Sequence, residues 1–76
     1  MATEFNGVVY DDVHGGPFDR GSADSWYNRG AKPHWYPEGS YRGEIVTEER
    51  MTLEQIQAYY AGYDWNEKNG GKKDWN

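Results

Sequence analysis

The side chains of this sequence that are best suited to binding chemistry are the basic and aromatic residues that alternate between residues 29 and 42. They are Arg29, Lys32, His34, Trp35, Tyr36, Tyr41 and Arg42. Cationic groups among stacking rings suit single-stranded nucleic acid, whose bases stack on aromatic side chains. Trp, Tyr and Arg also dominate the binding energy of protein interfaces. A third interpretation is that the rings fold back into a small core. We predict that Trp35, Tyr36 and Tyr41 contact a partner.

Catalytic residues do not form a recognisable constellation. A nucleophile needs an adjacent base, and the base needs an orienting group. His14 and His34 fall in expected loops, and no serine has the context of a nucleophile elbow. Gly15-Gly16 is followed by Pro17 and not by the lysine of a phosphate-binding loop. We therefore expect a protein without enzymatic activity.

Metal binding has one candidate, the run of Asp11, Asp12 and His14. Oxygen and imidazole donors suit a metal ion, but polar loops of this kind are more often simply solvated. The chain has no cysteine, which excludes disulfides and thiolate metal sites. We expect no metal and no cofactor.

Arg20 and Asp24 lie four residues apart at an expected helix start. This spacing predicts a surface ion pair on one helix face. Together with Asp19, the two residues could also tie the helix start to the preceding loop. In the alternative interpretation Arg20 and Arg29 reach the partner, and we include both among the candidate contacts.

The first helix that positions these residues is expected over about 19–29. Asp19 can cap it, and Gly30 suits the left-handed position that ends a helix. Trp26 and Tyr27 fall on one face with Ala23, so we expect these two rings in the core.

The second helix, over 53–69, has the clearest signals in the chain. Thr52 is followed three residues later by Gln55, which is a capping box, and Met51 and Ile56 have the spacing of a hydrophobic staple. The expected apolar stripe is formed by Leu53, Ile56, Tyr59, Tyr60 and Tyr63.

Small residues on the second helix predict a close helix–helix contact. Ala58 and Gly62 are four residues apart and form a shallow groove on one face. The first helix carries its own small residues, Gly21 and Ser25, so we expect it to occupy this groove.

The remaining segments are expected to be largely irregular. Residues 4–10 hold a β-branched pair beside an aromatic ring and predict at most a short strand or an extended arm. Residues 11–16 and 31–43 are expected as loops, 44–47 as a short extended piece, and 70–76 as a flexible tail. The predicted fold is a mainly α single domain over 1–76. It is a two-helix hairpin with an extended N-terminal arm, an aromatic loop and at most a short β element.

Composition points to a binding protein. Four Trp, seven Tyr and two Phe among 76 residues exceed what one small core needs, and Tyr and Trp are enriched at interfaces. The net charge of −5 argues against bulk affinity for nucleic acid or anionic membrane. The charge is uneven, because residues 20–43 hold four basic residues against two acidic ones, whereas residues 44–67 hold six acidic residues against one basic.

Size and the chain start bear on assembly and location. A domain this small has marginal stability, so a homodimer or docking onto a partner is expected to support it. No stretch is apolar enough to span a membrane, and the first residues lack the pattern of a signal peptide. We expect a cytoplasmic protein.

Three stretches resemble short uncharacterised proteins of tailed phages and prophages. They are the run 19–29 (DRGSADSWYNR), Pro33-His34, and the run 58–64 (AYYAGYD). The same skeleton over about 18–66 is similar to ribosome modulation factor. The resemblance implies a non-catalytic helical hairpin in the host cytoplasm that binds protein or RNA. This chain is acidic, whereas that factor is basic, as a ligand of ribosomal RNA must be.

Two functions follow from these observations. The first is a phage-type accessory protein that binds and modulates a host protein, as an inhibitor or adaptor. The alternative is a modulator associated with the ribosome or with RNA. For either, the candidate partner-binding residues are Arg20, Arg29, Lys32, His34, Trp35, Tyr36, Tyr41 and Arg42.

Overall fold

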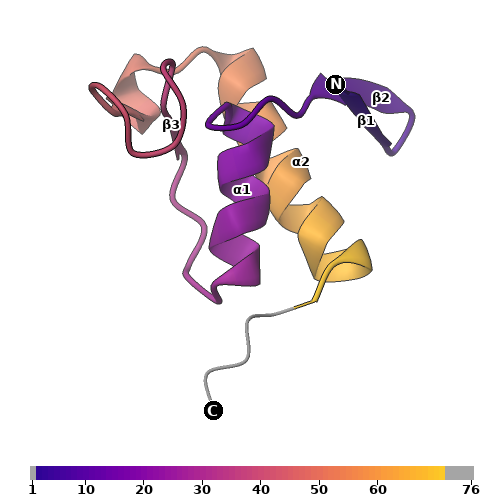
Figure 1. The fold of residues 1–76 in the computed structure, drawn as a ribbon. Coiled ribbons are helices and arrows are strands. Elements are labelled where there is room, and N and C mark those ends of the chain that lie inside the picture. Colours follow the sequence, from indigo (N-terminus) through magenta and orange to yellow (C-terminus); the bar gives the residue numbers. More distant parts are fainter. Residues whose placement is uncertain (1, 72–76) are drawn as a thin grey trace.

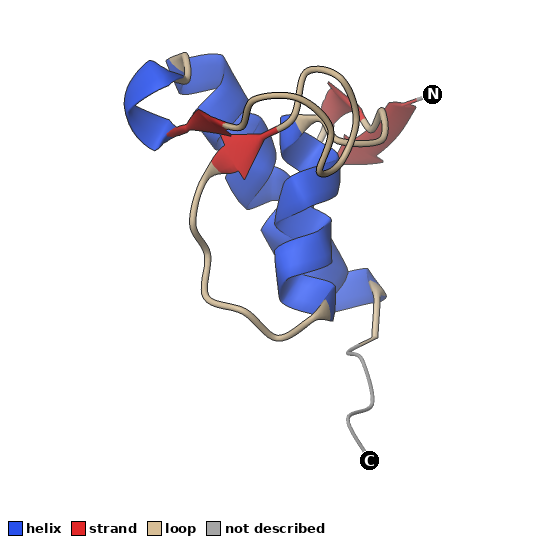
Figure 2. Cartoon of the chain, turned by 60° about the vertical axis from the view of Figure 1, so that its left-hand side comes forward, coloured by secondary structure: helices blue, strands red, loops and turns tan. Residues whose placement is uncertain are grey.

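The computed structural model describes residues 2–71 and contains two helices with four short strands. In chain order the elements are β1 (Ala2–Phe5), β2 (Val8–Asp11), α1 (Pro17–Trp26), β3 (His34–Trp35), β4 (Val46–Thr47), the 3-10 helix η1 (Glu48–Arg50) and α2 (Leu53–Asn69). The two helices pack against each other at the centre, and the strands lie around one end of the pair (Figure 1). From the end of α1 the chain returns along the helices to β3 (Figure 2).

The prediction of a mainly α fold is wrong, because the described residues form a mixed α/β structure with 43% helix and 17% strand. Strands β1 and β2 pair antiparallel, and so do β3 and β4. What was expected as an extended arm is a hairpin, in which Phe5 pairs with Val8 across a two-residue turn. Asn6 and Gly7 both have positive φ, 52° and 79°. Asn-Gly is the pair that a tight hairpin turn prefers, so the sequence did carry this signal.

The second sheet forms inside a segment that was expected to be loop. His34 pairs with Thr47, and Trp35 pairs with Val46. The extended piece expected at 44–47 is therefore a strand whose partner lies eleven or more residues earlier in the chain. Its pairing brings His34 back over the helices, where it reaches both α1 and α2.

Helix α1 begins two residues before the predicted start and ends three residues before the predicted end. Gly16 is its N-cap and Pro17 its first residue, because the fixed φ of proline suits that position and its missing N–H costs nothing there. The left-handed residue that ends the helix is Asn28, with φ of 60°, and not Gly30. The amides of Asn28 and Arg29 donate to Ser25 and Asp24 carbonyls, which satisfies the last turn.

Helix α2 spans the predicted range, and its capping box is confirmed. The Thr52 hydroxyl accepts from the Gln55 amide at 3.1 Å, and the Gln55 side chain accepts from the Thr52 amide at 2.9 Å. Two members of the expected apolar stripe are nevertheless on the surface: Leu53 is 84% exposed and Tyr60 is 42% exposed. Tyr59 of the expected stripe is buried, and the rest of the buried face carries Ala61, Gly62 and Asn66.

The helix contact is made by glycines, as predicted. A Cβ atom at Gly21 would lie 1.9 Å from the Tyr59 carbonyl oxygen, and one at Gly62 would lie 2.0 Å from the Phe18 carbonyl oxygen. Ser25 is fully buried in the same contact, where its hydroxyl accepts from Asn66. The two backbones therefore touch directly.

Burial of the small-residue face turns the aromatic face of α1 outward. Trp26 and Tyr27, expected in the core, are 42% and 36% exposed. The core aromatics are Phe18 and Tyr59, and Phe18 also stacks on Tyr10 of the hairpin with ring centroids 5.4 Å apart. Helix α1 thus buries Phe18, Gly21 and Ser25 and leaves Trp26, together with Tyr27 at its end, on the surface.

Between residues 2 and 71, no helix is both long and apolar enough to cross a bilayer. Most of the flexible tail predicted over 70–76 lies outside the described residues. The homodimer predicted from the small size stays a prediction.

Candidate functional site

A buried arginine organises the aromatic loop. The guanidinium of Arg20 donates from Nε to His34 Nε2 at 3.2 Å, from one terminal nitrogen to Ser40 Oγ at 3.3 Å, and from the other to the Tyr41 hydroxyl at 3.2 Å. Arg20 itself is only 4% exposed. We call Arg20, His34, Tyr36, Ser40 and Tyr41 the Arg20 cluster.

Aromatic faces enclose the Arg20 charge. The guanidinium carbon lies 5.5 Å from the centre of the Tyr36 ring and 5.0 Å from that of Tyr41. Within residues 2–71, no carboxylate lies within ion-pair distance of Arg20. A desolvated cation over an aromatic face is stabilised by about 2 kcal/mol. The rings and three neutral acceptors therefore replace the usual acidic partner.

Tyr41 is the exposed end of the Arg20 cluster. Its side chain is 67% exposed, although its hydroxyl is held by Arg20 and its ring by Tyr36, with centroids 5.4 Å apart. Its φ of 64° is the left-handed conformation, which is uncommon for a bulky residue. The pKa of its hydroxyl is lowered, because the Arg29 guanidinium first, and that of Arg20 next, stabilise the phenolate.

A second buried network centres on Asp24, which is 3% exposed. Its carboxylate accepts a hydrogen bond from the Tyr59 hydroxyl and another from Arg29 at 3.2 Å. The Tyr59 oxygen in turn accepts from the Lys32 amide at 2.9 Å. Burial raises the pKa of Tyr59, and the hydrogen bond to Asp24 raises it further. Asp24 thus ties α1 to α2 and to the loop after α1.

His34 connects the two networks. Arg20 Nε can only donate, so His34 Nε2 must accept. The Lys32 carbonyl can only accept, so Nδ1, 2.8 Å away, carries the proton. The ring is therefore the neutral Nδ1–H tautomer, and Nδ1 also lies 3.8 Å from the Asp24 carboxylate.

The ion pair predicted between Arg20 and Asp24 is not formed. Asp24 pairs instead with Arg29, and both Arg20 and Asp24 are buried. The other structural expectation holds for Asp19 alone, whose carboxylate accepts from the Gly15 amide at 2.9 Å and ties the helix start to its loop.

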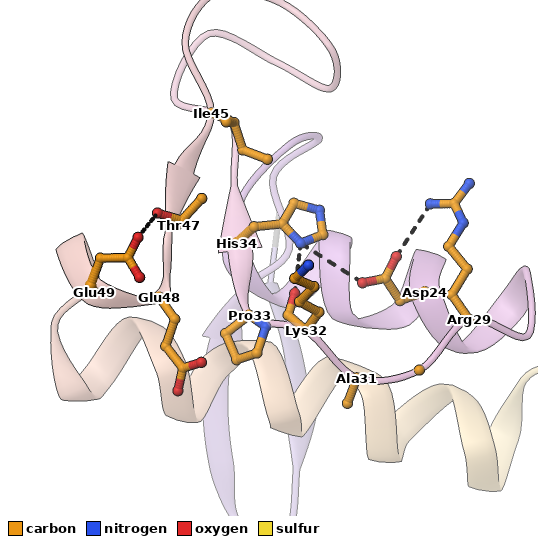
Figure 3. A pocket seen from close by; sticks show the side chains of 11 residues that line it. Asp24, Arg29, Ala31, Lys32, Pro33, His34, Ile45, Thr47, Glu48 and Glu49 are labelled. Atoms are coloured by element: carbon orange, nitrogen blue, oxygen red, sulfur yellow. Dashed lines mark hydrogen bonds and ion pairs between the residues drawn. The ribbon is translucent and has the colours of Figure 1, made fainter.

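An open cleft of about 860 Å3 lies beside these networks (Figure 3). One side is formed by the loop after α1, with Arg29 and Lys32, and another by β4 and η1, with Glu48 and Glu49. His34 stands between these two sides.

The structure brings most of the predicted residues together, but in different roles. Arg20, His34, Tyr36 and Tyr41 form one cluster, and Arg29 approaches Tyr41 closely enough to lower its pKa. Lys32 is exposed on the cleft, while Arg20 is too buried to touch a partner directly.

Two predicted residues lie apart from this cluster. Trp35 lies between His34 and Tyr36 in the chain, and because side chains alternate along a strand, its ring is directed away from theirs. The Trp35 Nε1 atom is buried and has no hydrogen-bond partner in the described part of the chain. Arg42 lines a separate hollow of about 510 Å3 with His14.

Sequence reasoning missed the parts played by Asp24, Tyr59 and Ser40. Tyr59 was expected on a buried stripe, but the apolar pattern gave no sign that its hydroxyl would need a carboxylate. The contact joins residues 35 positions apart, and local spacing holds no information at that range.

Asp11 and Asp12 have local structural partners. Asp11 accepts from the Val13 amide at 3.0 Å, and Asp12 accepts from the Thr3 hydroxyl at 2.6 Å. Across the described residues, no three His, Asp or Glu side chains are grouped so as to hold a metal ion.

Comparison of the chain with protein-family models, curated proteins and solved structures gives no match. The resemblance to phage proteins and to ribosome modulation factor therefore stays a prediction.

Alkaline pH should separate the two perturbed tyrosines. The folded state favours neutral Tyr59, whose pKa is raised, so its contribution to stability is lost as pH rises past about 10, where an unfolded tyrosine ionises. The lowered pKa of Tyr41 contributes with the opposite sign: its stabilisation is present above the unfolded pKa and lost as pH falls through the folded one. Tyr59→Phe should therefore flatten the alkaline loss of unfolding free energy, and Tyr41→Phe should steepen it.

Urea unfolding followed by circular dichroism at pH 7, 9, 10 and 11 measures this dependence. If the unfolding free energy of the wild type and of both variants depended equally on pH, the opposite pKa shifts of Tyr59 and Tyr41 would be contradicted.

Proposed function

We propose that this chain is a small non-catalytic protein that binds a host protein through the surface around Tyr41. Its neighbours on that surface are Arg29, whose side chain is 46% exposed, and Tyr27, over whose ring the Arg29 guanidinium lies at 4.8 Å. Tyr and Arg are the residues most often dominant in protein interfaces.

The observation that supports the proposal is an exposed ring anchored by a buried cation. A side chain immobilised on binding typically costs about 0.5–1.5 kcal/mol in lost freedom. Tyr41 is already ordered by Arg20 and Tyr36, so most of that cost falls on folding. A protein gains nothing for its own core from holding a ring that is 67% exposed, whereas a binding surface gains a preorganised anchor.

Charge favours a protein partner over RNA. Arg29 and Lys32 are cationic, but Glu48 and Glu49 line the same cleft, and the chain carries a net charge of −5. A phosphate backbone laid along this surface would meet acidic side chains within the site. A protein surface with both signs of charge suffers no such repulsion.

The biological role we propose is that of a phage-type accessory protein which inhibits a host protein or adapts it to another. This part rests on the sequence resemblance and on the lack of a nucleophile–base pair among the predicted site residues. Ribosome or RNA association is the competing function, and the following experiment distinguishes the two.

Affinity capture from a bacterial lysate tests the proposal. We expect the wild-type chain to retain one host protein after nuclease treatment and in high salt. Tyr41→Ala should weaken that binding about 30-fold, the loss of a 2 kcal/mol interface anchor. Tyr60→Ala is the matched control, because Tyr60 is also an exposed tyrosine but lies on α2.

Two results would contradict the proposal. Ribosomal particles that nuclease or salt removes would instead favour the RNA function, since phosphate contacts weaken steeply with salt. A captured protein whose binding is equally strong with Tyr41→Ala would place the interface elsewhere.

A further inference from the structure

The cleft beside the Arg20 cluster has walls of opposite charge. Arg29 and Lys32 come from the loop that follows α1, whereas Glu48 and Glu49 come from η1 (Figure 3). Ile45, which is 39% exposed, supplies apolar surface in the same cleft, and the buried Pro33 also lines it. Its volume of about 860 Å3 is in the range of pockets that hold small ligands or short peptide segments.

Each wall of the cleft has a charged group that can still form an ion pair with a ligand. Neither the Lys32 ammonium nor the Glu48 carboxylate has an ion-pair partner among residues 2–71. Glu49 is oriented by the Thr47 hydroxyl, which donates to it at 2.8 Å. Arg29 is oriented by Asp24 through one terminal nitrogen and by the Tyr27 ring beneath it. A guanidinium held in this way presents its other N–H groups in a fixed direction.

We infer that this cleft binds a peptide segment of the partner protein that carries both an acidic and a basic side chain. The inference rests on the proposed function and names the chemistry that its site would recognise. The acidic side chain lies on the Arg29 and Lys32 wall, where a carboxylate can accept charge-assisted hydrogen bonds. The basic side chain lies on the Glu48 and Glu49 wall, and the segment between the two charged side chains covers Ile45.

Ligands with one sign of charge fit this cleft poorly. An anionic segment would meet Glu48 and Glu49, and a cationic segment would meet Arg29 and Lys32. Like charges placed together in an interface repel and weaken binding, so the repulsive wall excludes wrong ligands as much as the attractive wall selects the right one.

Titration of the full-length, 15N-labelled chain with four blocked heptapeptides tests the inference. The peptides share one sequence and differ at two positions, which hold Glu and Lys, two Glu, two Lys, or two Gln. We expect the mixed peptide to shift the amide signals of Ala31, Ile45 and Thr47, and to bind at least about tenfold more tightly than the other three. Cleft signals that respond to none of the peptides, or equally to all four, would overturn it.

Charge reversal sharpens the test. Glu48→Lys should move the preference to the two-Glu peptide, and Lys32→Glu should move it to the two-Lys peptide. Arg50→Glu is the matched control, because Arg50 is exposed, pairs with Glu44 at 2.8 Å, and does not line the cleft. An unchanged preference in Glu48→Lys and Lys32→Glu would overturn the inference.

This experiment can fail independently of the proposed function. If the peptides fail while capture of a host protein still depends on Tyr41, the Tyr41 surface binds without the cleft and only the further inference falls. If the mixed peptide binds and no Tyr41-dependent protein is captured, the proposed function falls and the cleft specificity stands.

Discussion

Replacing either Gly21 or Gly62 by Ala is expected to lower the melting temperature by 10 °C or more. The new Cβ atom at Gly21 would lie 1.9 Å from the Tyr59 carbonyl oxygen, and that at Gly62 would lie 2.0 Å from the Phe18 carbonyl oxygen. Both obstacles are backbone atoms of the opposite helix, so no side chain can rotate away and the helices must separate. Overpacking costs about 1–3 kcal/mol and occasionally more, and each kcal/mol shifts the melting point of a domain this size by about 4–8 °C.

The direction of the change separates the effect of the helix contact from that of helix propensity. Ala is a better helix former than Gly by up to about 1 kcal/mol, so each variant would be stabilised if α1 and α2 were not in contact. Gly30→Ala is the control, because nothing lies within 4 Å of the Cβ it would add. Thermal unfolding followed by circular dichroism gives the melting points of the wild type and the three variants, and a rise for Gly21→Ala would contradict the contact between α1 and α2.

Replacing Asp24 by Ala is expected to lower the free energy of unfolding by about 3 kcal/mol. The carboxylate accepts from the Tyr59 hydroxyl and from Arg29, and hydrogen bonds to a charged group contribute about 1.5–3 kcal/mol each. Arg29 is half in solvent and can hydrate, so most of the loss comes from the buried Tyr59 hydroxyl left without an acceptor.

A double-mutant cycle isolates this contact. Asp24→Ala, Tyr59→Phe and the double variant are compared by urea unfolding at pH 7. We expect the double variant to lose clearly less than the two single losses combined, because each single change already breaks the same bond. Asp64→Ala, at an exposed acid of α2, should change stability by no more than about 0.5 kcal/mol. Strict additivity would mean that the Asp24–Tyr59 contact carries no free energy.

Short-range signals in the sequence were reliable for α2 but not for α1, whose N-cap is Gly16 and not Asp19 and whose left-handed end residue is Asn28 and not Gly30. Thr52 and Gln55 set the start of α2, because a capping box needs only backbone and side-chain groups three residues apart. Gly21 and Gly62 indicated the helix contact, because two helix backbones can approach this closely only where small residues face each other. Asn6-Gly7 specified a hairpin just as locally, so the single short strand or extended arm expected over 4–10 is instead a pair of strands.

The charge and aromatic content also indicated a basic and aromatic segment that forms part of one site. Arg20, His34, Tyr36 and Tyr41 do meet. These residues could be chosen as candidates from their types alone, because cations and aromatic rings attract each other in any fold that brings them together.

The sequence alone thus determined the second helix, its cap, the glycine contact and the residue types of the candidate site. Only the tertiary structure decided that Arg20 is buried and Tyr41 exposed, that Trp26 faces outward, and that Asp24 serves Tyr59 instead of Arg20. The physical reason is that burial and partner choice depend on contacts between distant parts of the chain. Once the glycines bring the helix backbones together, the small face of α1 is covered and Trp26 and Tyr27 are left outside. The loop residues must then satisfy the polar groups that remain within.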